Sequence, residues 1–358
     1  MTAYAERPWT EHYDPGVPRT LEPYPDKSLS DLLRESAQAA PERAALITPA
    51  KLPGVGFLSH TMSYGELDRQ SDALAAGLIA MGLKKGDRVA IVLPNSSAFA
   101  ISYFGVLKAG GVVAATNPTY PPPRLQYQIN DCDATVVITL SLFYKTIKAI
   151  QPDTKVKTII VTNIKEYLPP LARVLFSLTR EKKDGHWVDQ LATGDFEFQA
   201  VLRQYAGNQP QVAVKPTDLA LFQYTGGTTG VSKGAMLTHR ALVANMLQIQ
   251  AWSSVLEGEP YRLNRADMLY LGAIPMFHVY GLVVLLSQAI ASGSRIVLVA
   301  NARDINHTVE IIAHYRPNVF LGVPAMYNAI VNHPAVKSGK VSMDSFLISS
   351  SGAAPLPP

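Results

Sequence analysis

Apolar positions along the chain alternate between helical spacing and the short unbroken runs of buried strands. Ser28 predicts the start of a first helix, because Asp31 follows at the third position and leucines then repeat at helical spacing. Ser63 and Glu66 predict a capping box, in which each side chain bonds the backbone N–H of the other residue. The helix that follows is expected to end near Gly82.

Beyond this point, runs rich in Val and Ile alternate with helical segments such as 97–109 and 124–131. Continuous apolar runs are typical of parallel strands that are covered on both faces. The sequence therefore predicts an α/β protein with two doubly wound, mostly parallel sheets packed together, which would bind ligands at the carboxyl ends of their strands. The predicted strands are 89–93, 112–115, 135–138, 158–161, 268–274, 295–299, 318–322 and 346–348.

Three regions are expected along the chain. Residues 1–27 form an arm rich in Pro and Tyr, residues 28–215 a first α/β subdomain, and residues 216–358 a second one. An insert at 163–195 interrupts the first subdomain with a stripe at i, i+3, i+4 and i+7, flanked by Arg and Lys. The stripe indicates either a surface helix packed on the body or an interfacial helix that contacts anionic lipid. Its residues are Leu171, Val174, Leu175 and Leu178.

Composition narrows the class of protein. Hydrophobic residues make up 47% of the chain and charged residues 17%, as in globular proteins. The net charge of +4 is mild, and without a concentrated basic stripe we expect no nucleic-acid partner. Cys132 is the single cysteine, which favours a reducing compartment. With no leader pattern and no run of eighteen apolar residues, we expect a cytoplasmic protein.

The segment Tyr224–Gly234, YTGGTTGVSKG, carries the clearest chemistry. Glycines allow a tight turn that exposes backbone N–H groups, Thr hydroxyls add donors, and Lys233 brings a mobile positive charge to a phosphate. A Walker loop would place Lys directly after Gly and open a helix, whereas here Lys233 precedes Gly234 and both flanks, 219–224 and 235–237, predict strands. The alternative, a hairpin without a ligand, needs only two or three turn residues.

Small residues follow three other predicted strands. Pro275–His278 is the first such turn, Val323–Tyr327 the second and Ser349–Leu356 the third. Each alone is typical of a connecting loop, and a lone His is usually structural. The apolar neighbours of His278 favour a substrate-orienting role, and the three turns together predict one shared cleft.

In this order, these motifs resemble the AMP-forming acyl-activating family, which includes acyl-CoA synthetases, peptide-synthetase adenylation domains and luciferases. The resemblance runs from about Ser28 onward and also includes Leu107–Pro118. It implies that the Thr/Gly loop holds the pyrophosphate of ATP and that Thr225 helps to ligate Mg²⁺. The implied ATP-binding residues are Thr225, Gly226, Gly227, Thr228, Thr229, Gly230 and Lys233.

The resemblance also assigns the turns. His278 would be the catalytic residue that lines the acyl pocket beside the α-phosphate, and Gly352, Ala353 and Ala354 would border adenine and the acyl carbonyl. The proline-rich opening, the full loop and the insert look most like bacterial long-chain fatty acid–CoA ligases. The implied substrates are a fatty acid, ATP and coenzyme A, with Mg²⁺. Peripheral contact with the inner face of the membrane and a homodimer are compatible with it.

The family continues beyond this point with an aromatic-Gly-x-Thr-Glu motif, a Thr-Gly-Asp motif and a small lid domain with a catalytic Lys, and the printed sequence contains none of these. We therefore expect the amino-terminal portion of a ligase, with little activity alone. Two alternatives remain at this stage: a non-catalytic nucleotide- or acyl-binding module, and an adenylating enzyme for a shorter, aryl or amino acid. The amino-acid version usually places an Asp after the His-bearing strand, where Val279–Leu282 offers none.

Overall fold

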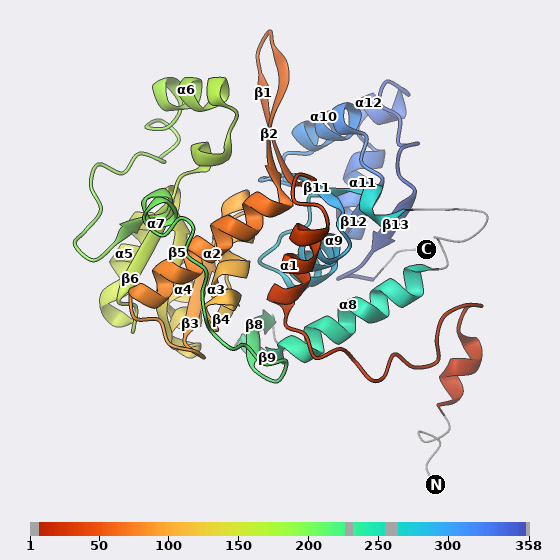
Figure 1. The fold of residues 1–358 in the computed structure, drawn as a ribbon. Helices are drawn as coiled ribbons and strands as arrows, with labels where there is room; N and C mark the ends of the chain where they lie inside the picture. The colour runs from red at the N-terminus through yellow and green to blue at the C-terminus, as the bar shows by residue number, and fades with distance from the viewer. Residues whose placement is uncertain (1–6, 226–231, 255–263, 356–358) are drawn as a thin grey trace.

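The computed structural model describes residues 7–225, 232–254 and 264–355, and it contains two β-sheets with helices packed on both (Figure 1). Neighbouring strands run parallel except at one edge of each sheet, where a hairpin adds an antiparallel strand. The prediction of two mostly parallel sheets in an α/β protein is confirmed.

The first sheet has seven strands in the order β7-β6-β5-β3-β4-β8-β9. Side chains of β3 alternate between its faces, so that Val89 and Ile91 enter the core between the sheets while Ala90 and Val92 enter the outer core. The strands are β3 (Arg88–Val92), β4 (Val112–Ala115), β5 (Ala134–Leu140), β6 (Thr158–Thr162), β7 (Phe196–Glu197), β8 (Leu219–Thr225) and β9 (Lys233–Thr238).

The second sheet has six strands in the order β13-β12-β10-β11-β1-β2. Its antiparallel hairpin projects from the body at the top of Figure 1. The strands are β1 (Ala44–Leu52), β2 (Gly56–Ser63), β10 (Leu269–Gly272), β11 (Arg295–Leu298), β12 (Val319–Gly322) and β13 (Ile348–Ser351).

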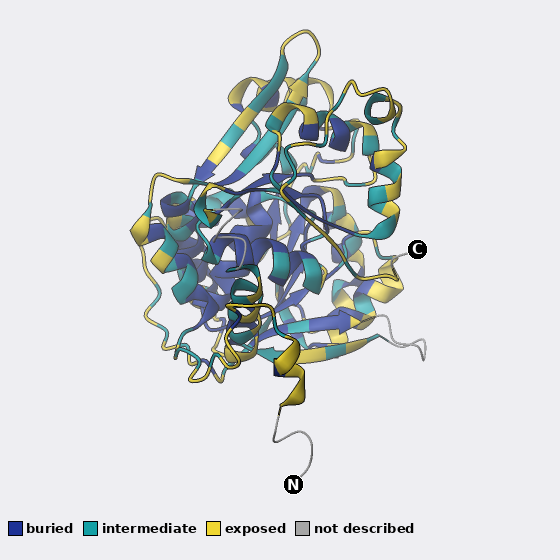
Figure 2. Cartoon of the chain, turned by 90° about the vertical axis from the view of Figure 1, so that its right-hand side faces the viewer, coloured by how far each residue is buried: buried dark blue, intermediate teal, exposed yellow. Residues whose placement is uncertain are grey.

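Helices fill the space between the sheets and cover their outer faces. The largest hydrophobic core lies between the sheets and joins residues of α1, α2, α3, α8 and η7 with both of them. The helices α4 and α5 pack on the outer face of the first sheet, and α10 packs on the outer face of the second sheet. Figure 2 shows this buried centre inside an exposed rim. The helices are α1 (Leu29–Ala39), α2 (Tyr64–Ala80), α3 (Ser97–Lys108), α4 (Pro122–Asp131), α5 (Tyr144–Ile150), α6 (Pro170–Thr179), α7 (Phe198–Gln204), α8 (His239–Ser253), α9 (Gln288–Ala291), α10 (Ile305–Tyr315), α11 (Pro324–Val331) and α12 (Pro334–Lys337), with the π-helix η7 (Tyr280–Ser287) and the 3₁₀ turns η1 (Pro8–His12) and η4 (Ile164–Tyr167).

One ion-pair cluster lies within this core. The Nζ atom of Lys108, at the end of α3, is fully buried and lies 2.6 Å from Asp68 and 2.7 Å from Asp72, both on α2. A buried charge is tolerated only when it is paired, so the cluster joins the two helices that pack most closely between the sheets.

The sheets do not divide the chain at residues 215 and 216, where the two subdomains were expected to meet. The hairpin β1–β2 comes from the first segment but pairs with β11 of the second sheet, through Leu46 and Ile296. Conversely, β8–β9 comes from the second segment but pairs with β4 of the first sheet, through Val113 and Leu221. Each segment therefore completes the sheet of the other. A hydrophobic pattern reports that a strand is buried but not which strand lies beside it.

Several local predictions are confirmed and others need correction. Ser28 and Asp31 form the reciprocal capping box of α1. At α2 the Ser63 side chain accepts from the Glu66 backbone, but the Glu66 carboxylate accepts from Gln70 one turn later, so only half of the predicted box forms. The strand predicted at 346–348 lies at 348–351, and the hairpin β1–β2 was missed because its strands are only partly buried.

The insert at 163–195 stands on a buried polar base. The amide of Asn163 donates to the carboxylate of Glu181 at 2.8 Å, and Lys165 pairs with the same carboxylate at 2.6 Å. The helix α6, which follows in the insert, does not pack its apolar stripe on the body. The interpretation of the insert as a surface helix packed on the body is therefore wrong for this stripe. Only Ala172 of α6 is buried. The stripe residues are exposed by 49% at Leu171, 55% at Val174, 40% at Leu175 and 78% at Leu178.

Candidate functional site

The Thr/Gly segment joins two strands, as the sequence predicted, and these strands pair antiparallel. Thr225 ends β8 and pairs in register with Lys233, which opens β9. Both residues are exposed, and the Thr225 carbonyl accepts a hydrogen bond of 2.7 Å from the Ser232 hydroxyl. The ends of the loop are thus fixed beside each other at the edge of the first sheet. Gly226, Gly227, Thr228, Thr229 and Gly230 lie outside the described residues.

Two tyrosines attach this hairpin to α4. The Tyr224 hydroxyl donates to the carboxylate of Asp131 at 2.6 Å, and the Tyr127 hydroxyl donates to the Ser232 carbonyl at 3.0 Å. Burial, together with the hydrogen bond to Asp131, raises the pKa of Tyr224. Tyr224 is therefore a neutral donor at neutral pH, and it positions the strand from which Thr225 extends.

The turn that carries His278 is held by a residue that the sequence analysis did not single out. Asn95, buried in the connection after β3, donates to the carbonyls of Gly272 and Ile274 at 2.8 and 2.9 Å. Its side-chain oxygen accepts from the Met276 N–H at 2.8 Å. One side chain from the connection after β3 thus bonds three backbone groups at the carboxyl end of β10. Its sequence signal was an Asn two residues after the end of the predicted strand 89–93.

The backbone folds tightly after His278. The His278 N–H donates to the Pro275 carbonyl at 3.1 Å, and the π-helix η7 begins two residues later. A Cβ on Gly281 would lie 2.1 Å from the Pro275 oxygen, so only glycine allows this approach. The His278 side chain itself is exposed. Single π-helical turns occur often at functional sites.

Tyr280 brings the turn after β10 to the turn after β13. Its hydroxyl donates to the Ser350 carbonyl at 3.0 Å, and its ring lies where a Cβ on Gly352 would meet it at 3.1 Å. Ala353, the next residue, has a φ of 62°, which is unusual for a residue other than glycine. The backbone of Gly352–Ala354 is therefore held beside η7 in a strained turn.

The turn after β12 joins the same group. The Tyr327 hydroxyl donates to the carbonyls of Phe320 and Ser350, at 2.7 and 3.0 Å, and the Gly352 N–H donates to the Gly322 carbonyl at 3.1 Å. Burial raises the pKa of Tyr327 to about 12. The three small-residue turns thus meet at the carboxyl ends of β10, β12 and β13, where a parallel sheet presents its ligand-binding edge.

A mostly apolar pocket opens beside these turns. Its walls come from α8, η7 and the strands β10, β12 and β13, and Ser350 belongs both to the pocket and to the turn bonded by Tyr280. A ligand in the pocket would lie next to the backbone that leads to Gly352. The lining residues are Ile249, Ser253, Arg265, Met268, Tyr270, Val284, Gln288, Val319, Leu321, Ile348 and Ser350.

The arrangement offers two kinds of chemistry, one on each sheet. Thr225 and Lys233 supply a hydroxyl and a positive charge, as a phosphate requires, while the apolar pocket suits a hydrocarbon chain. Among the described residues, no group of three or more His, Cys, Asp or Glu side chains could hold a metal ion alone. In the same ranges no helix is long and apolar enough to cross a membrane.

Comparison with known proteins identifies the family to which this architecture belongs. The model of the AMP-binding enzyme family matches residues 33–358. The chain belongs to this family. A long-chain fatty acid–CoA ligase of Bacillus subtilis is 34% identical over 98% of the chain. The solved structure of a long-chain fatty acid–CoA ligase from Archaeoglobus fulgidus matches 97% of the chain with a TM-score of 0.75 and 25% identity.

The chain spans about 60% of the length of the B. subtilis relative and 61% of the archaeal chain. Another relative is named for a different substrate. A 4-coumarate–CoA ligase-like protein of Arabidopsis thaliana is 28% identical over 83% of the chain. Membership of the AMP-binding enzyme family therefore rests on the match over residues 33–358, and the relatives within it are named for different acyl substrates.

Proposed function

We propose that this chain supplies the ATP- and acyl-binding part of a long-chain fatty acid–CoA ligase. The observation that carries the proposal is the apolar pocket, which shares Ser350 with the turn leading to Gly352. Each buried CH₂ contributes about 0.8 kcal/mol, so a long acyl chain has enough apolar surface to bind by burial alone. The similarity to ligases named for long-chain fatty acids supports the same substrate class.

In the proposed reaction, an oxygen of the fatty carboxylate attacks the α-phosphorus of ATP, and pyrophosphate leaves with the bonding electron pair. The CoA thiol then loses its proton and attacks the acyl carbonyl, so that a thioester forms and AMP leaves. Phosphoryl-type transfer depends mainly on positioning and on neutralising negative charge. Lys233 would neutralise charge on the leaving pyrophosphate, and His278 would orient the acyl-phosphate group as the catalytic residue.

Mg²⁺ would accompany ATP at the end of β8. Its usual ligands in nucleotide sites are phosphate oxygens, waters and one or two protein oxygens. The exposed hydroxyl of Thr225, beside Lys233 in register, fits the role of one protein oxygen. The bound ion would offset phosphate charge, while the backbone of Gly352, Ala353 and Ala354 would border adenine and the acyl carbonyl.

The reaction is tested by ATP–pyrophosphate exchange that depends on palmitate. The protein assayed should join residues 1–358 to the C-terminal region of the B. subtilis relative, because this chain spans only about 60% of that length. We expect exchange with palmitate to exceed exchange with 4-coumarate, phenylalanine or octanoate at least tenfold. Faster exchange with one of these acids would transfer the proposal to that substrate. Nucleotide binding without exchange would favour the non-catalytic module.

We also propose that α6 rests on the membrane that contains the fatty acid substrate. Its four exposed apolar side chains lie beside Arg180, Lys182 and Lys183, which are exposed as well. Apolar side chains that enter the interface, next to cations that attract anionic head groups, are typical of interfacial helices. In Figure 1, α6 projects from the first sheet on the same side as the hairpin β1–β2.

Co-sedimentation with vesicles of phosphatidylcholine and phosphatidylglycerol tests this contact. The double variant Leu175→Ser, Leu178→Ser should lose most of its vesicle-bound fraction, with unchanged stability. Leu347→Ser is the matched control, because Leu347 is also a leucine with 55% exposure, but it lies directly before β13 and not in α6. Equal binding by both variants would show that α6 does not contact the membrane.

A further inference from the structure

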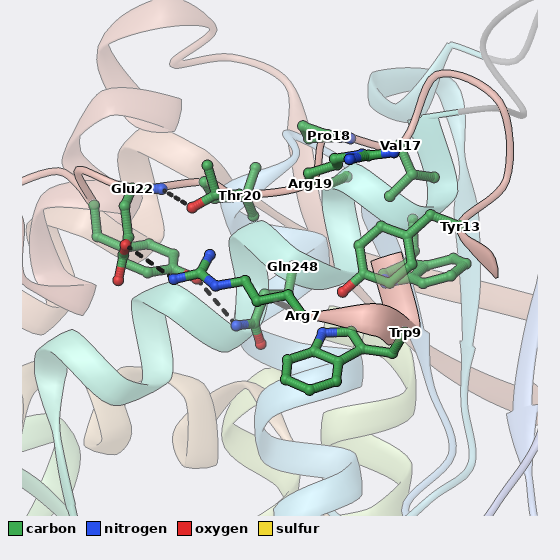
Figure 3. Close-up of a pocket in the computed structure, with 13 residues that line it drawn as sticks. Arg7, Trp9, Tyr13, Val17, Pro18, Arg19, Thr20, Glu22 and Gln248 are labelled. Atoms are coloured by element: carbon green, nitrogen blue, oxygen red, sulfur yellow. Dashed lines mark hydrogen bonds and ion pairs between the residues drawn. The ribbon is translucent and has the colours of Figure 1, made fainter. Parts of the chain in front are cut away.

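A second cavity lies away from the strand-end turns, between the N-terminal arm and α8. Residues 7–24 of the arm run along the C-terminal half of α8 and enclose about 320 Å³, as much space as small-molecule sites commonly have (Figure 3). The helix contributes Gln248, Ala251 and Trp252. The function proposed above gives this cavity no role.

Four of the thirteen residues that line the cavity are aromatic. Trp9, Tyr13 and Tyr24 of the arm face the cavity together with Trp252 of α8. The rings of Tyr13 and Trp252 meet edge to face at 5.0 Å, and the Tyr24 hydroxyl accepts from the Gln248 amide at 3.0 Å. Aromatic side chains offer large apolar surfaces at little entropic cost, so this wall suits a hydrocarbon chain or a flat ring.

Charge selects among such ligands. Arg7 lies 3.8 Å from Glu22, with both side chains at least half exposed, whereas Arg19 has no ion pair within the described ranges. Two guanidinium groups against one carboxylate leave the cavity positive. An aromatic cage alone would attract ammonium groups, but this excess of positive charge opposes them and favours an anion.

The position of the cavity connects it to the acyl pocket. Ile249 and Ser253 of α8 line the apolar pocket, while Gln248 and Trp252, one residue earlier in each case, line the arm cavity. Residues adjacent in a helix point about 100° apart, so the last turns of α8 form a wall of both spaces. A ligand that holds the arm on this helix also holds a wall of the acyl pocket.

From these features we infer that the arm cavity is a second binding site for a single-chain amphiphile with an anionic head group, separate from the substrate pocket. The head group, a carboxylate or a phosphate monoester, pairs with Arg19, and the far part of the chain lies against Trp9 and Trp252. The site is a property of the arm and α8, and it does not require that the proposed ligase reaction occurs.

Tryptophan quenching by a brominated chain tests the site on the 358-residue protein, since bromine quenches only rings that it nearly touches. Two of the three tryptophans, Trp9 and Trp252, line the cavity, and Trp187 lies in the insert. We expect saturable quenching by 12-bromododecanoate below its micelle concentration. Arg19→Met should raise the half-saturating concentration roughly tenfold, which corresponds to a loss of about 1.4 kcal/mol in binding free energy. The double variant Trp9→Phe, Trp252→Phe should abolish the signal.

Controls separate this site from the acyl pocket and from nonspecific binding. Trp187→Phe should keep the quenching, and Val284→Phe, which narrows the acyl pocket, should keep both quenching and its dependence on Arg19. Loss of quenching in Val284→Phe alone would place the ligand in the acyl pocket and overturn the inference. Equal quenching by 12-bromododecyl trimethylammonium would overturn the charge selection. A comparison with 12-bromododecyl phosphate decides which anionic head group binds more tightly.

Discussion

The hairpin β8–β9 and the turn Pro275–His278 both carry residues of the candidate site, but they are attached to the body by different means. The turn is fixed from within, because Asn95 bonds three backbone groups and Met276 is completely buried. The hairpin lies at a sheet edge, with Thr225 and Lys233 exposed and two tyrosine hydroxyls as its links to α4. We infer that the acyl side of the site is built by folding, while the nucleotide side depends on a few separable bonds.

The largest effect should come from Asn95→Ala, which removes the fixed element of this comparison. The variant leaves the Ile274 carbonyl and the Met276 N–H without partners, while the Gly272 carbonyl keeps the Val299 N–H at 3.1 Å. Each group left unpaired costs about 1–3 kcal/mol, so we expect a loss of about 3 kcal/mol. Urea unfolding measures it. Asn332→Ala is the matched control, because the Asn332 amide is exposed and bonds only within its own helix turn. Similar losses in both variants would show that the Asn95 bonds contribute little.

The second largest effect should come from His239, the first residue of α8, which directly follows β9. Buried His239 accepts a hydrogen bond from the Leu29 N–H at 3.2 Å and so ties α8 to the start of α1. Burial lowers the pKa of His239 to about 4, from 6.5 in the unfolded chain. Between these values the unfolded state binds the proton and the folded state does not, so stability falls as the pH falls from 6.5 to 4.

This linkage predicts a loss of about 2 kcal/mol between pH 7 and pH 5, from 1.5 pH units at about 1.4 kcal/mol each. Urea unfolding curves at the two pH values measure it, and His239→Gln supplies the comparison because glutamine does not titrate there. A wild-type loss no larger than that of His239→Gln would show that other groups cause the pH dependence.

A smaller effect should follow from Tyr224→Phe, which cuts one link between the hairpin and α4. A buried hydrogen bond to a carboxylate contributes about 1.5–3 kcal/mol, and we expect the lower end because Asp131 lies nearer the surface. A double-mutant cycle with Asp131→Asn isolates the pair, with an expected coupling of about 1.5 kcal/mol. Additive losses in the double variant would mean that the two side chains do not stabilise each other.

The sequence predicted the parts of the site that depend on local pattern. Runs of Val and Ile predict buried strands. The apolar flanks and the glycines of Tyr224–Gly234 predict a strand, a loop and a second strand. The placement of His278 and Gly352 after strands of one sheet followed in the same way, because parallel strands end at a common edge.

The contacts that join these parts could not be predicted, because they connect residues far apart in sequence. Asn95 lies nearly two hundred positions from Met276, and no local period links them. The exchange of hairpins between the two sheets is hidden for the same reason, since pairing partners leave no mark on a single strand. The stripe of α6 was visible as amphipathic, but its exposure depends on the absence of a facing element among the described residues, which only the structure reveals.

The smallest predicted effect tests the comparison between the hairpin and the turn most directly. One tyrosine hydroxyl is removed from the hairpin side and an equivalent one from the turn side. Tyr127 and Tyr280 both donate a hydroxyl to a backbone carbonyl at 3.0 Å, the first on the hairpin at Ser232 and the second on the turn at Ser350. We expect Tyr127→Phe and Tyr280→Phe to leave the midpoint of urea unfolding nearly unchanged.

Their ligand binding should differ. Tyr127→Phe frees the end of the hairpin and should weaken the binding of a fluorescent ATP analogue roughly threefold, as the loss of one modest hydrogen bond would, with no effect on acyl binding. Tyr280→Phe should weaken the binding of a fluorescent fatty acid by a similar factor and affect the nucleotide less. Titration of each variant with both probes measures the four constants. If both variants weakened both ligands equally, the two sides would be coupled, and the division between a fixed acyl side and a separable nucleotide side would be wrong.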